Sequence, residues 1–411
     1  MHLLTPLFSL LTLPSLLHAF PNVPFKTSTR WIHDSTGANF TYVGVNWPGA
    51  GEVMIPEGLQ YASIESIVSK IKSLKMNVVR LTFAIEMVDD IKDNGGDVTV
   101  QRAFVKALGS ANGEKVWQSV VKNNPQFNAS TTRLQVFDAV AAELSKQGIY
   151  VHLDNHMSKG KWCCSTNDGN AWFGDTDFNT EKWLRGLQFM ADHVMTLLQT
   201  RKWTSMVSIG LRNEFRKPDK AGKSLAYNWS VWYDQNVAAA NLVNAANPDI
   251  LIFFSGLDFD TKLNPIPGAE DLGSGKRFQK SNFKYSDKLV LELHNYQNSA
   301  TDCNSMKSGL WNNGFKALDP SARNQMPVVL TEFGFSQTDD SYNKVYATCL
   351  RRIIPEWDAG WTVWVLAGSY YIRSGTQDYE EAWGLLNHNW SDWRRSQAIA
   401  GLRQMVDASL R

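Results

Sequence analysis

Two glutamates close two strand-like runs of this chain. Residues 207–215 read Val-Ser-Ile-Gly-Leu-Arg-Asn-Glu-Phe, and residues 327–334 read Pro-Val-Val-Leu-Thr-Glu-Phe-Gly. Each run is mainly apolar until its last residues, where Glu214 and Glu332 stand. Because a carboxylate is rarely buried in a core without a partner, we expect both side chains at strand exits, where a sheet meets solvent or substrate.

A pair of carboxylates on one rim would suit one kind of chemistry. If both strands belong to one parallel barrel, Glu214 and Glu332 lie on the same face of it. Cleavage of a glycosidic bond needs one carboxyl to protonate the leaving oxygen and a second at the anomeric carbon. The alternative, two unrelated surface glutamates, is weakened by the other polar residues at strand ends.

Six further residues that could serve a site stand at or near the ends of strand-like runs. On residues 150–156, His152, Asp154 and His156 recur at every second position, so they share the face that points into the barrel. The run 289–296 repeats this pattern with Glu292, His294 and Tyr296. The candidates beside the two glutamates are Arg80, His156, Asn213, His294, Tyr296 and Trp364.

The elements that must position these residues alternate along the chain. Helical patterns at 62–75, 132–147, 181–200, 229–246 and 340–355 separate short apolar runs. This alternation predicts a single (β/α)8 barrel, the TIM-barrel fold, with long loops on its catalytic face at 84–131, 157–180, 256–287 and 297–326. The eight predicted strands are 42–46, 77–83, 149–155, 207–213, 250–255, 288–294, 327–332 and 361–366.

In order and strand position, the candidate residues resemble those of glycoside hydrolase family 5, the cellulase family. The opening Gly-Val-Asn-Trp at 44–47 is also similar to that family's first strand. One departure is Phe215, which stands where the family usually has proline after the Asn-Glu pair. With Asp-Asn-His-Met-Ser-Lys at 154–159 and Trp-Cys-Cys-Ser at 162–165, it resembles a plant- or fungal-type branch, which leaves the polymer specificity open.

The resemblance implies retaining hydrolysis of β-linked glucans or related polysaccharides by two glutamates. Glu332 would be the nucleophile, and Glu214 would be the general acid and then the base. Arg80 would keep Glu332 ionised, and the Tyr296 hydroxyl would orient it. Asn213 would reach the sugar 2-hydroxyl.

The same resemblance assigns the remaining candidates to substrate binding. His156 and His294 would bind sugar hydroxyls or orient the glutamates, and Trp364 would be the floor beneath the sugar at the cleavage point. Trp47 and three further tryptophans are weaker candidates, for which plain packing is an equal alternative: Trp162, Trp172 and Trp383.

Composition limits the partners. The chain has 411 residues, 43% of them hydrophobic, and a net charge of +1, which disfavours nucleic acid as a partner. We expect no cofactor, no membrane association and a monomer acting on an oligo- or polysaccharide. The 16 tryptophans fit this, since their flat faces suit the apolar faces of sugar rings as well as a core.

The N-terminus predicts a secreted, extracellular protein. Residues 1–19 are apolar, short and interrupted by prolines, as in a signal peptide, and 20–411 would form the catalytic domain. Four Asn-X-Ser/Thr sequons fit this interpretation: those at Asn39, Asn128, Asn228 and Asn389.

The four cysteines of the chain are even in number, as expected of a disulfide-bonded secreted protein. Because adjacent cysteines seldom pair with each other, we expect Cys163 and Cys164 to bond to Cys303 and Cys349 in some order. Zinc binding is a weak alternative, since the cysteines lack CxxC spacing.

Two rival functions remain at this level. His152, Asp154 and His156 on one strand face could hold a metal in a metal-dependent barrel hydrolase, but a satisfied polar layer is common inside such barrels and is the favoured explanation. A catalytically inactive sugar-binding barrel is the second rival. Among enzymes, an endo-β-1,4-glucanase is the family's commonest activity, and the alternatives are a mannanase, an exo-acting β-glycosidase or an enzyme for glycosides with lipid or small aglycones. If 84–131 and 256–287 wall one end of the cleft into a pocket, exo action or a small substrate is favoured.

Overall fold

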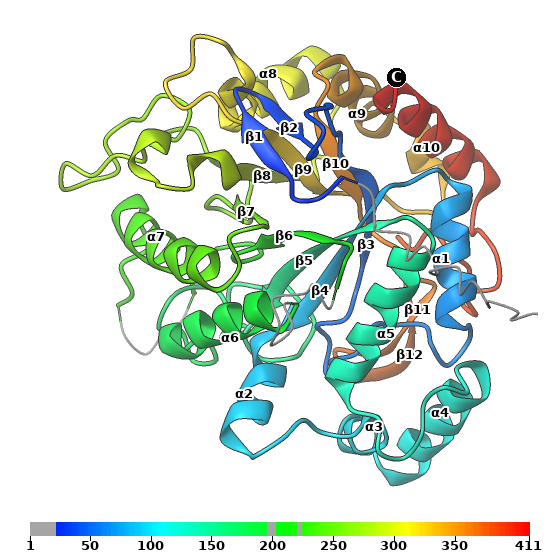
Figure 1. The fold of residues 1–411 in the computed structure, drawn as a ribbon. Coiled ribbons are helices and arrows are strands. Elements are labelled where there is room, and N and C mark those ends of the chain that lie inside the picture. The colour runs from blue at the N-terminus through cyan, green and yellow to red at the C-terminus, as the bar shows by residue number, and fades with distance from the viewer. Residues whose placement is uncertain (1–21, 195–202, 220–223) are drawn as a thin grey trace, which may run out of the picture.

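The computed structural model describes residues 22–194, 203–219 and 224–411 (Figure 1). Eight parallel strands close into a barrel in the order β10-β3-β4-β5-β6-β7-β8-β9, with Trp361 of β10 paired to Val43 of β3. This confirms the predicted TIM barrel. The strands are β3 (Val43–Trp47), β4 (Val78–Ala84), β5 (Tyr150–Met157), β6 (Met206–Gly210), β7 (Leu251–Phe254), β8 (Leu289–Asn295), β9 (Val328–Phe333) and β10 (Gly360–Val363).

Helices surround the barrel, as Figure 1 shows. The α-helices are α1 (Ile64–Ser73), α2 (Ile85–Asp93), α3 (Val100–Leu108), α4 (Ser110–Asn123), α5 (Arg133–Lys146), α6 (Thr180–His193), α7 (Trp229–Ala246), α8 (Cys303–Asn313), α9 (Val345–Glu356) and α10 (Ser396–Ser409). Short 3-10 turns lie at η1 (Lys280–Asn282), η2 (Ser286–Lys288), η3 (Phe315–Leu318) and η4 (Asp340–Asn343). All five predicted helices are confirmed within the described residues, with 195–200 of the predicted 181–200 segment lying outside them.

Local sequence explains where these helices begin and which face they bury. The Ser63 hydroxyl caps α1 by accepting from the Ser66 N–H. The buried residues of α1 then recur at helical spacing: Ile64, Ile67, Val68 and Ile71. Asn228, one of the sequon asparagines, caps α7 through the N–H of Val231.

A hairpin that the sequence did not predict covers one end of the barrel. Strands β1 (Lys26–Ser28) and β2 (Trp31–His33) pair antiparallel, and Figure 1 shows them across the barrel. Phe25 is fully buried, with its ring 4.9 Å from that of Tyr150 at the start of β5. Lys288 Nζ donates to the Phe25 carbonyl at 2.8 Å. The apolar cluster around Phe25 contains the first residues of several strands, so the hairpin seals the N-terminal end of the barrel.

The segment 84–131, predicted as a long loop, contains the three helices α2, α3 and α4. These helices support a second unpredicted hairpin, β11 (Ser369–Arg373) with β12 (Thr376–Glu380). The ring of Phe104 on α3 lies 4.8 Å from that of Tyr371, and Gln377 Nε2 donates to the Leu108 carbonyl at 3.0 Å. The β11–β12 hairpin is therefore braced from behind and stands beside the C-terminal end of the barrel.

The predicted cysteine pairing is wrong. Cys303 bonds to Cys349, which joins α8 to α9, and Cys163 bonds to its neighbour Cys164. No helix in the described part of the chain is both long and apolar enough to span a bilayer. The predicted signal peptide, residues 1–19, lies outside the described residues.

Candidate active site

Glu332, in β9, is held through both carboxylate oxygens. Arg80 Nη1 donates to Oε1 at 2.6 Å, and the Tyr296 hydroxyl donates to Oε2 at 2.9 Å. The side chain is 4% exposed, and the guanidinium is fully buried. A charged donor on one oxygen and a hydroxyl donor on the other fix the orientation of this carboxylate.

Arg80, from β4, organises the interior of the barrel around this carboxylate. Its Nη1 also donates to Asn46 Oδ1 at 2.9 Å, and its Nη2 contacts Asn213 Oδ1 at 2.9 Å and Asp154 Oδ1 at 2.8 Å. Burial disfavours its charge, but the carboxylates of Asp154, Glu332 and Glu292 raise the pKa of Arg80 above its ordinary value. The guanidinium therefore remains charged. Its contacts link β4 to β3, β5 and β9 inside the barrel.

Glu214 follows β6, which ends at Gly210, and adopts a left-handed backbone conformation with φ of 49°. Such a φ is uncommon for a residue with a side chain and persists where surrounding contacts enforce it. Here the Glu214 N–H donates to Asp260 Oδ2 at 2.6 Å. The carboxyl Oε1 lies 3.0 Å from His294 Nδ1, and that ring is fully buried.

The surroundings of Glu214 favour its protonated form. Burial, the largest influence, raises the pKa of Glu214 above that of an ordinary glutamate. Burial also lowers the pKa of His294 to about 4, so this imidazole is neutral near pH 7. Burial together with nearby Glu292 and Glu214 raises the pKa of Asp260 well above its usual range. Among the described residues, the side chain paired with the Glu214 carboxyl is His294, whereas the Glu332 carboxylate is paired with the charged Arg80.

The two glutamates face each other across His294. One atom each of Glu214, His294 and Glu332 lie within 4.8 Å of one another. The β8–β9 register explains this proximity, because His294 pairs directly with Glu332.

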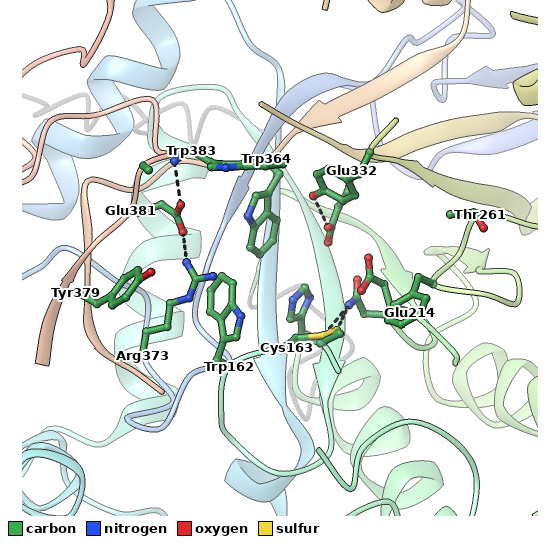
Figure 2. A pocket seen from close by; sticks show the side chains of 16 residues that line it. Trp162, Cys163, Glu214, Thr261, Glu332, Trp364, Arg373, Tyr379, Glu381 and Trp383 are labelled. Atoms are coloured by element: carbon green, nitrogen blue, oxygen red, sulfur yellow. Dashed lines mark hydrogen bonds and ion pairs between the residues drawn. A yellow bond between two sulfur atoms is a disulfide. The ribbon is translucent and has the colours of Figure 1, made fainter. Parts of the chain in front are cut away.

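The glutamates open into a cavity of about 520 Å³ (Figure 2). Trp364 forms part of its wall and stacks on His156, with ring centroids 5.5 Å apart and planes 6° from parallel. His156 Nδ1 is in turn 2.8 Å from Asp154 Oδ2. The residues lining the cavity are His156, Trp162, Cys163, Cys164, Asn213, Glu214, Phe259, Thr261, Tyr296, Glu332, Trp364, Arg373, Tyr379, Glu381, Ala382 and Trp383.

At one end of this cavity, two of its lining residues stack on each other across the rim. The guanidinium of Arg373, at the tip of β11, lies 3.5 Å from the centre of the Trp162 ring, and Trp162 belongs to the segment after β5. Arg373 Nη1 also donates to Glu381 Oε2 at 2.9 Å, and Glu381 is buried. Figure 2 shows Arg373, Glu381 and Tyr379 opposite Glu214 and Thr261.

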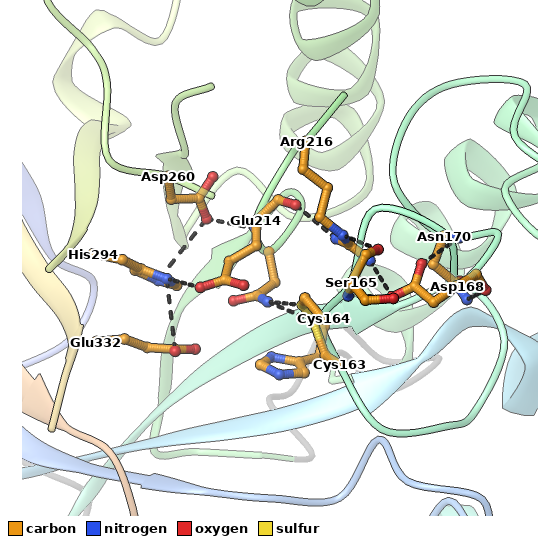
Figure 3. Close-up of a disulfide and its surroundings, with 12 residues drawn as sticks. Cys163, Cys164, Ser165, Asp168, Asn170, Glu214, Arg216, Asp260, His294 and Glu332 are labelled. Carbon is orange, nitrogen blue, oxygen red and sulfur yellow. Dashed lines mark hydrogen bonds and ion pairs between the residues drawn. A yellow bond between two sulfur atoms is a disulfide. The ribbon is translucent and has the colours of Figure 1, made fainter. Parts of the chain in front are cut away.

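The Cys163–Cys164 disulfide lines the cavity between Trp162 and Glu214 (Figure 2), and Figure 3 shows its surroundings. Asn213 Nδ2 is 3.4 Å from Cys163 Sγ and 3.5 Å from Cys164 Sγ. The following residues are tied to the Glu214 segment, because Arg216 donates through Nε to the Ser165 carbonyl at 2.8 Å and pairs with Asp168.

The structure brings together eight of the nine predicted site residues. Glu214, Glu332, His156, Asn213, Tyr296 and Trp364 line the cavity, whereas Arg80 and His294 lie fully buried behind the glutamates. His294 therefore contacts Glu214 and has no surface for a sugar hydroxyl.

The ninth prediction, Trp47, is wrong as a sugar-binding residue. Trp47 is fully buried, and its indole N–H donates to the Glu57 carbonyl at 3.0 Å. Its neighbour Asn46 points into the barrel toward Arg80, so the alternation of a strand directs Trp47 outward. Trp172 is buried as well, against Phe215, whereas Trp162 and Trp383 line the cavity.

Sequence reasoning missed the cavity's far end and one buried carboxyl. Arg373, Tyr379 and Glu381 belong to the unpredicted β11–β12 region. Asp260 follows the predicted strand 250–255, so its position past a strand end was a usable signal. No residue of 84–131 lines the cavity directly, and 256–287 contributes Phe259 and Thr261 to the lining.

Two groups of described side chains have the spacing of metal ligands. One is Glu214, His294 and Glu332, and the other is Cys163, Cys164 and Glu214, whose sulfurs are bonded to each other rather than present as thiolates. The alternative site at His152, Asp154 and His156 is divided: His152 Nδ1 is 2.8 Å from Ser208 Oγ, and Asp154 contacts Arg80 and His156.

Known proteins share this sequence pattern and fold. The family model of cellulase (glycosyl hydrolase family 5) matches residues 34–369. A glycosyl hydrolase 5 family protein of Chamaecyparis obtusa is 32% identical over 98% of this chain and 69% of its own length. The hyperthermophilic endocellulase of Pyrococcus horikoshii superposes with a TM-score of 0.68 at 16% identity, covering 95% of this chain and 100% of that one. The endoglucanase catalytic domain of Xanthomonas campestris gives 0.66 at 18% identity, covering 93% and 99%. The chain therefore belongs to glycosyl hydrolase family 5, the cellulase family, and is a glycoside hydrolase.

Proposed function

We propose that this protein hydrolyses β-glycosidic bonds with retention of anomeric configuration, by double displacement between Glu332 and Glu214. The observation that carries the proposal is that their carboxyl groups approach within 4.8 Å of each other. Retaining enzymes place their carboxyls about 5–5.5 Å apart, whereas inverting enzymes leave about 6.5–9.5 Å for a water molecule.

In the first step Glu332 attacks the anomeric carbon while Glu214 protonates the departing glycosidic oxygen. The bond to the leaving sugar breaks, and a glycosyl ester forms on Glu332. In the second step Glu214, now ionised, takes a proton from water, whose oxygen attacks the anomeric carbon and releases Glu332. Arg80 and Tyr296 support these roles by orienting the Glu332 carboxylate, and burial supports them by raising the pKa of Glu214, the proton donor of the first step.

The aromatic lining supports a sugar chain as the substrate. Trp364 offers its ring as the floor for the sugar at the cleavage point, and Asn213 is near enough to Glu214 to bind that sugar's 2-hydroxyl. His156, beside Trp364, offers its second ring nitrogen to a hydroxyl. The endocellulase of Pyrococcus horikoshii, a structural neighbour with a TM-score of 0.69, has been crystallised with cellotetraose, which favours a β-linked glucan.

The contact between Arg373 and Trp162 favours an exo-acting enzyme as the second candidate. The leaving group departs on the side of its proton donor, Glu214, so the opposite end holds the non-reducing part of the chain. Arg373 and Trp162 meet across that end. Such a wall limits how many sugars precede the cleavage point, whereas an endo-acting enzyme needs a cleft open at both ends.

Secretion and glycosylation complete the proposal. Residues 1–19 would direct export, and the asparagines of all four sequons are exposed. We propose an extracellular monomer that requires no cofactor. A mobility shift on enzymatic deglycosylation and one molecular mass in solution would test these points, and full activity in EDTA would separate the scheme from metal-dependent hydrolysis.

The deciding experiment is product analysis on cellohexaose, mannohexaose, laminarin and aryl β-glycosides, with the anomer first released followed by NMR. Release of the β-anomer supports double displacement, and first release of the α-anomer overturns it. Products of intermediate length identify an endo-acting enzyme, and release of single sugars or disaccharides from one end identifies an exo-acting one. Binding of these sugars with no hydrolysis of any would instead support the inactive sugar-binding barrel.

A further inference from the structure

The Cys163–Cys164 disulfide occupies an unusual place for a structural crosslink. Both residues line the cavity, and both sulfurs lie within 4.8 Å of a Glu214 carboxyl oxygen (Figure 3). A bond between sequence neighbours closes almost no loop, so it has little of the chain-entropy effect through which disulfides usually stabilise a fold. Its position beside Glu214 therefore suggests a role in the geometry of the site rather than in the stability of the fold.

The contact that suggests this role is with the Asn213 side chain. Arginine has only donors, so the amide oxygen of Asn213 must face Arg80 Nη2, at 2.9 Å. The amide nitrogen is then turned toward the two sulfurs, at 3.4 and 3.5 Å. The amide is thus held from both sides, by a strong donor at its oxygen and by the sulfur pair at its nitrogen.

A disulfide suits this position because its sulfur atoms can only accept hydrogen bonds, and only weakly. The Asn213 N–H groups are aligned by the sulfurs but not fully satisfied, so a sugar hydroxyl oxygen is a better acceptor. Two free thiols would add S–H donors that compete with the amide and would add titratable groups beside Glu214. The bonded pair avoids both effects.

We propose that the Cys163–Cys164 disulfide is a positioning element of the active site, which aims the Asn213 amide at the 2-hydroxyl of the sugar at the cleavage point. This inference rests on the proposed function. It predicts that the disulfide contributes chiefly to transition-state stabilisation, because the 2-hydroxyl contact strengthens there.

The surrounding segment has its own anchors, so removal of the bond leaves it attached. Asn170 Oδ1 accepts from the N–H groups of Ser158 and Lys159, each at 2.9 Å. Arg216 holds the Ser165 carbonyl and Asp168. A variant without the disulfide should therefore fold.

The test compares the double variant Cys163→Ala/Cys164→Ala with the matched control Cys303→Ala/Cys349→Ala, which removes the disulfide between α8 and α9. Each is assayed on an aryl β-glucoside and on its 2-deoxy analogue. We expect the first variant to lose about 10- to 100-fold in kcat/KM on the glucoside, the scale of a misplaced contact. On the 2-deoxy analogue, which lacks the hydroxyl, we expect little change, and the control should match wild type on both.

Two further measurements make the result independent of folding. In an Asn213→Ala background the loss of the Cys163–Cys164 bond should have almost no additional effect, since coupled residues are non-additive. In the Cys303→Ala/Cys349→Ala background, dithiothreitol can reduce only Cys163–Cys164, and the loss on the glucoside should reverse on reoxidation.

Equal losses on the glucoside and its 2-deoxy analogue would overturn the inference, as would full additivity with Asn213→Ala. Activity of the reduced or doubly substituted enzyme equal to wild type would also overturn it, while leaving double displacement intact. If wild type hydrolyses no glycoside of the panel, the proposed function fails first, and the inference fails with it.

Discussion

At the scale of single residues, Glu214 and Glu332 are the same side chain in opposite surroundings. Glu332 is ion-paired with the guanidinium of Arg80 at 2.6 Å. The Glu214 side chain is only 12% exposed and contacts a neutral imidazole, and desolvation raises its pKa. Pairs of carboxyls whose environments differ in this way identify the base or nucleophile and the acid of a reaction.

We predict that Glu332→Gln and Glu214→Gln each lower kcat by at least about 100-fold with the fold retained, because each removes a positioned reacting group. Azide distinguishes the two roles when the side chains are shortened further. In Glu214→Ala it should attack the glycosyl ester and give a β-glycosyl azide, whereas in Glu332→Ala it should replace the nucleophile and give the α-anomer. The same azide anomer from both variants would contradict the assignment.

The pH dependence follows from the raised pKa of Glu214. The protonated acid is needed in the first step, so kcat/KM should fall as the pH rises through that pKa, at a higher pH than an ordinary glutamate would give. On a substrate whose leaving group needs no proton, Glu214→Gln should abolish this alkaline limb, because its amide does not titrate. Activity of the wild type that keeps rising above neutrality would refute the role.

At the scale of elements, the β11–β12 hairpin decides the shape of the site. It brings Arg373 onto Trp162 and is supported from behind by α3 through Phe104 and Leu108. Glu332 lies in β9 and Glu214 just after β6, and the hairpin contributes Arg373 and Tyr379 to the lining of the cavity in front of them.

Arg373→Ala should widen this end of the cavity, because it removes both the contact with Trp162 and the bond to Glu381. We expect a larger share of internal cleavage on cellohexaose than in wild type, measured by chromatography of early products. The control is Arg395→Ala, whose guanidinium pairs with Asp340 and is absent from the cavity lining. An unchanged product pattern in Arg373→Ala would show that this wall does not limit the substrate.

At the scale of the whole molecule, an apolar cluster that stabilises the fold and the candidate active site lie at opposite ends of the barrel. The β1–β2 hairpin and the cluster around Phe25 seal the N-terminal end, and the cavity occupies the C-terminal end. The Cys303–Cys349 bond joins the outer helices α8 and α9 and has no residue in the cavity. Removing this disulfide should therefore change the stability of the protein without changing its catalysis.

The variant Cys303→Ala/Cys349→Ala should therefore lower the free energy of unfolding by about 2–4 kcal/mol, as expected when a loop of this length is no longer closed. Its kcat/KM at a temperature well below unfolding should equal that of wild type. Denaturant titration and steady-state assays measure the two quantities. A fall in kcat/KM with no loss of stability would contradict the separation.

Much of this protein was predictable because it depends on local periodicity. Near-continuous apolar strands that alternate with helical patterns define the barrel, and alternation along a strand places His156, His294 and Tyr296 on its inner side. In a parallel barrel strand ends gather on one face, so Glu214 and Glu332 could be paired without coordinates. The same alternation, applied to Asn46, would also have directed Trp47 outward.

The tertiary structure alone decided what depends on contacts between distant segments. Whether Cys163 bonds to Cys164 or to Cys303 follows from the path of the segments between them, which no local pattern encodes. The meeting of Arg373 with Trp162 joins residues more than 200 positions apart through a hairpin braced by α3. Asp260 likewise reaches the Glu214 N–H through a left-handed turn. Sequence by itself determined the fold and the two glutamates that the proposed chemistry needs, whereas packing of the loops determined the shape of the cavity and the orientation of Asn213.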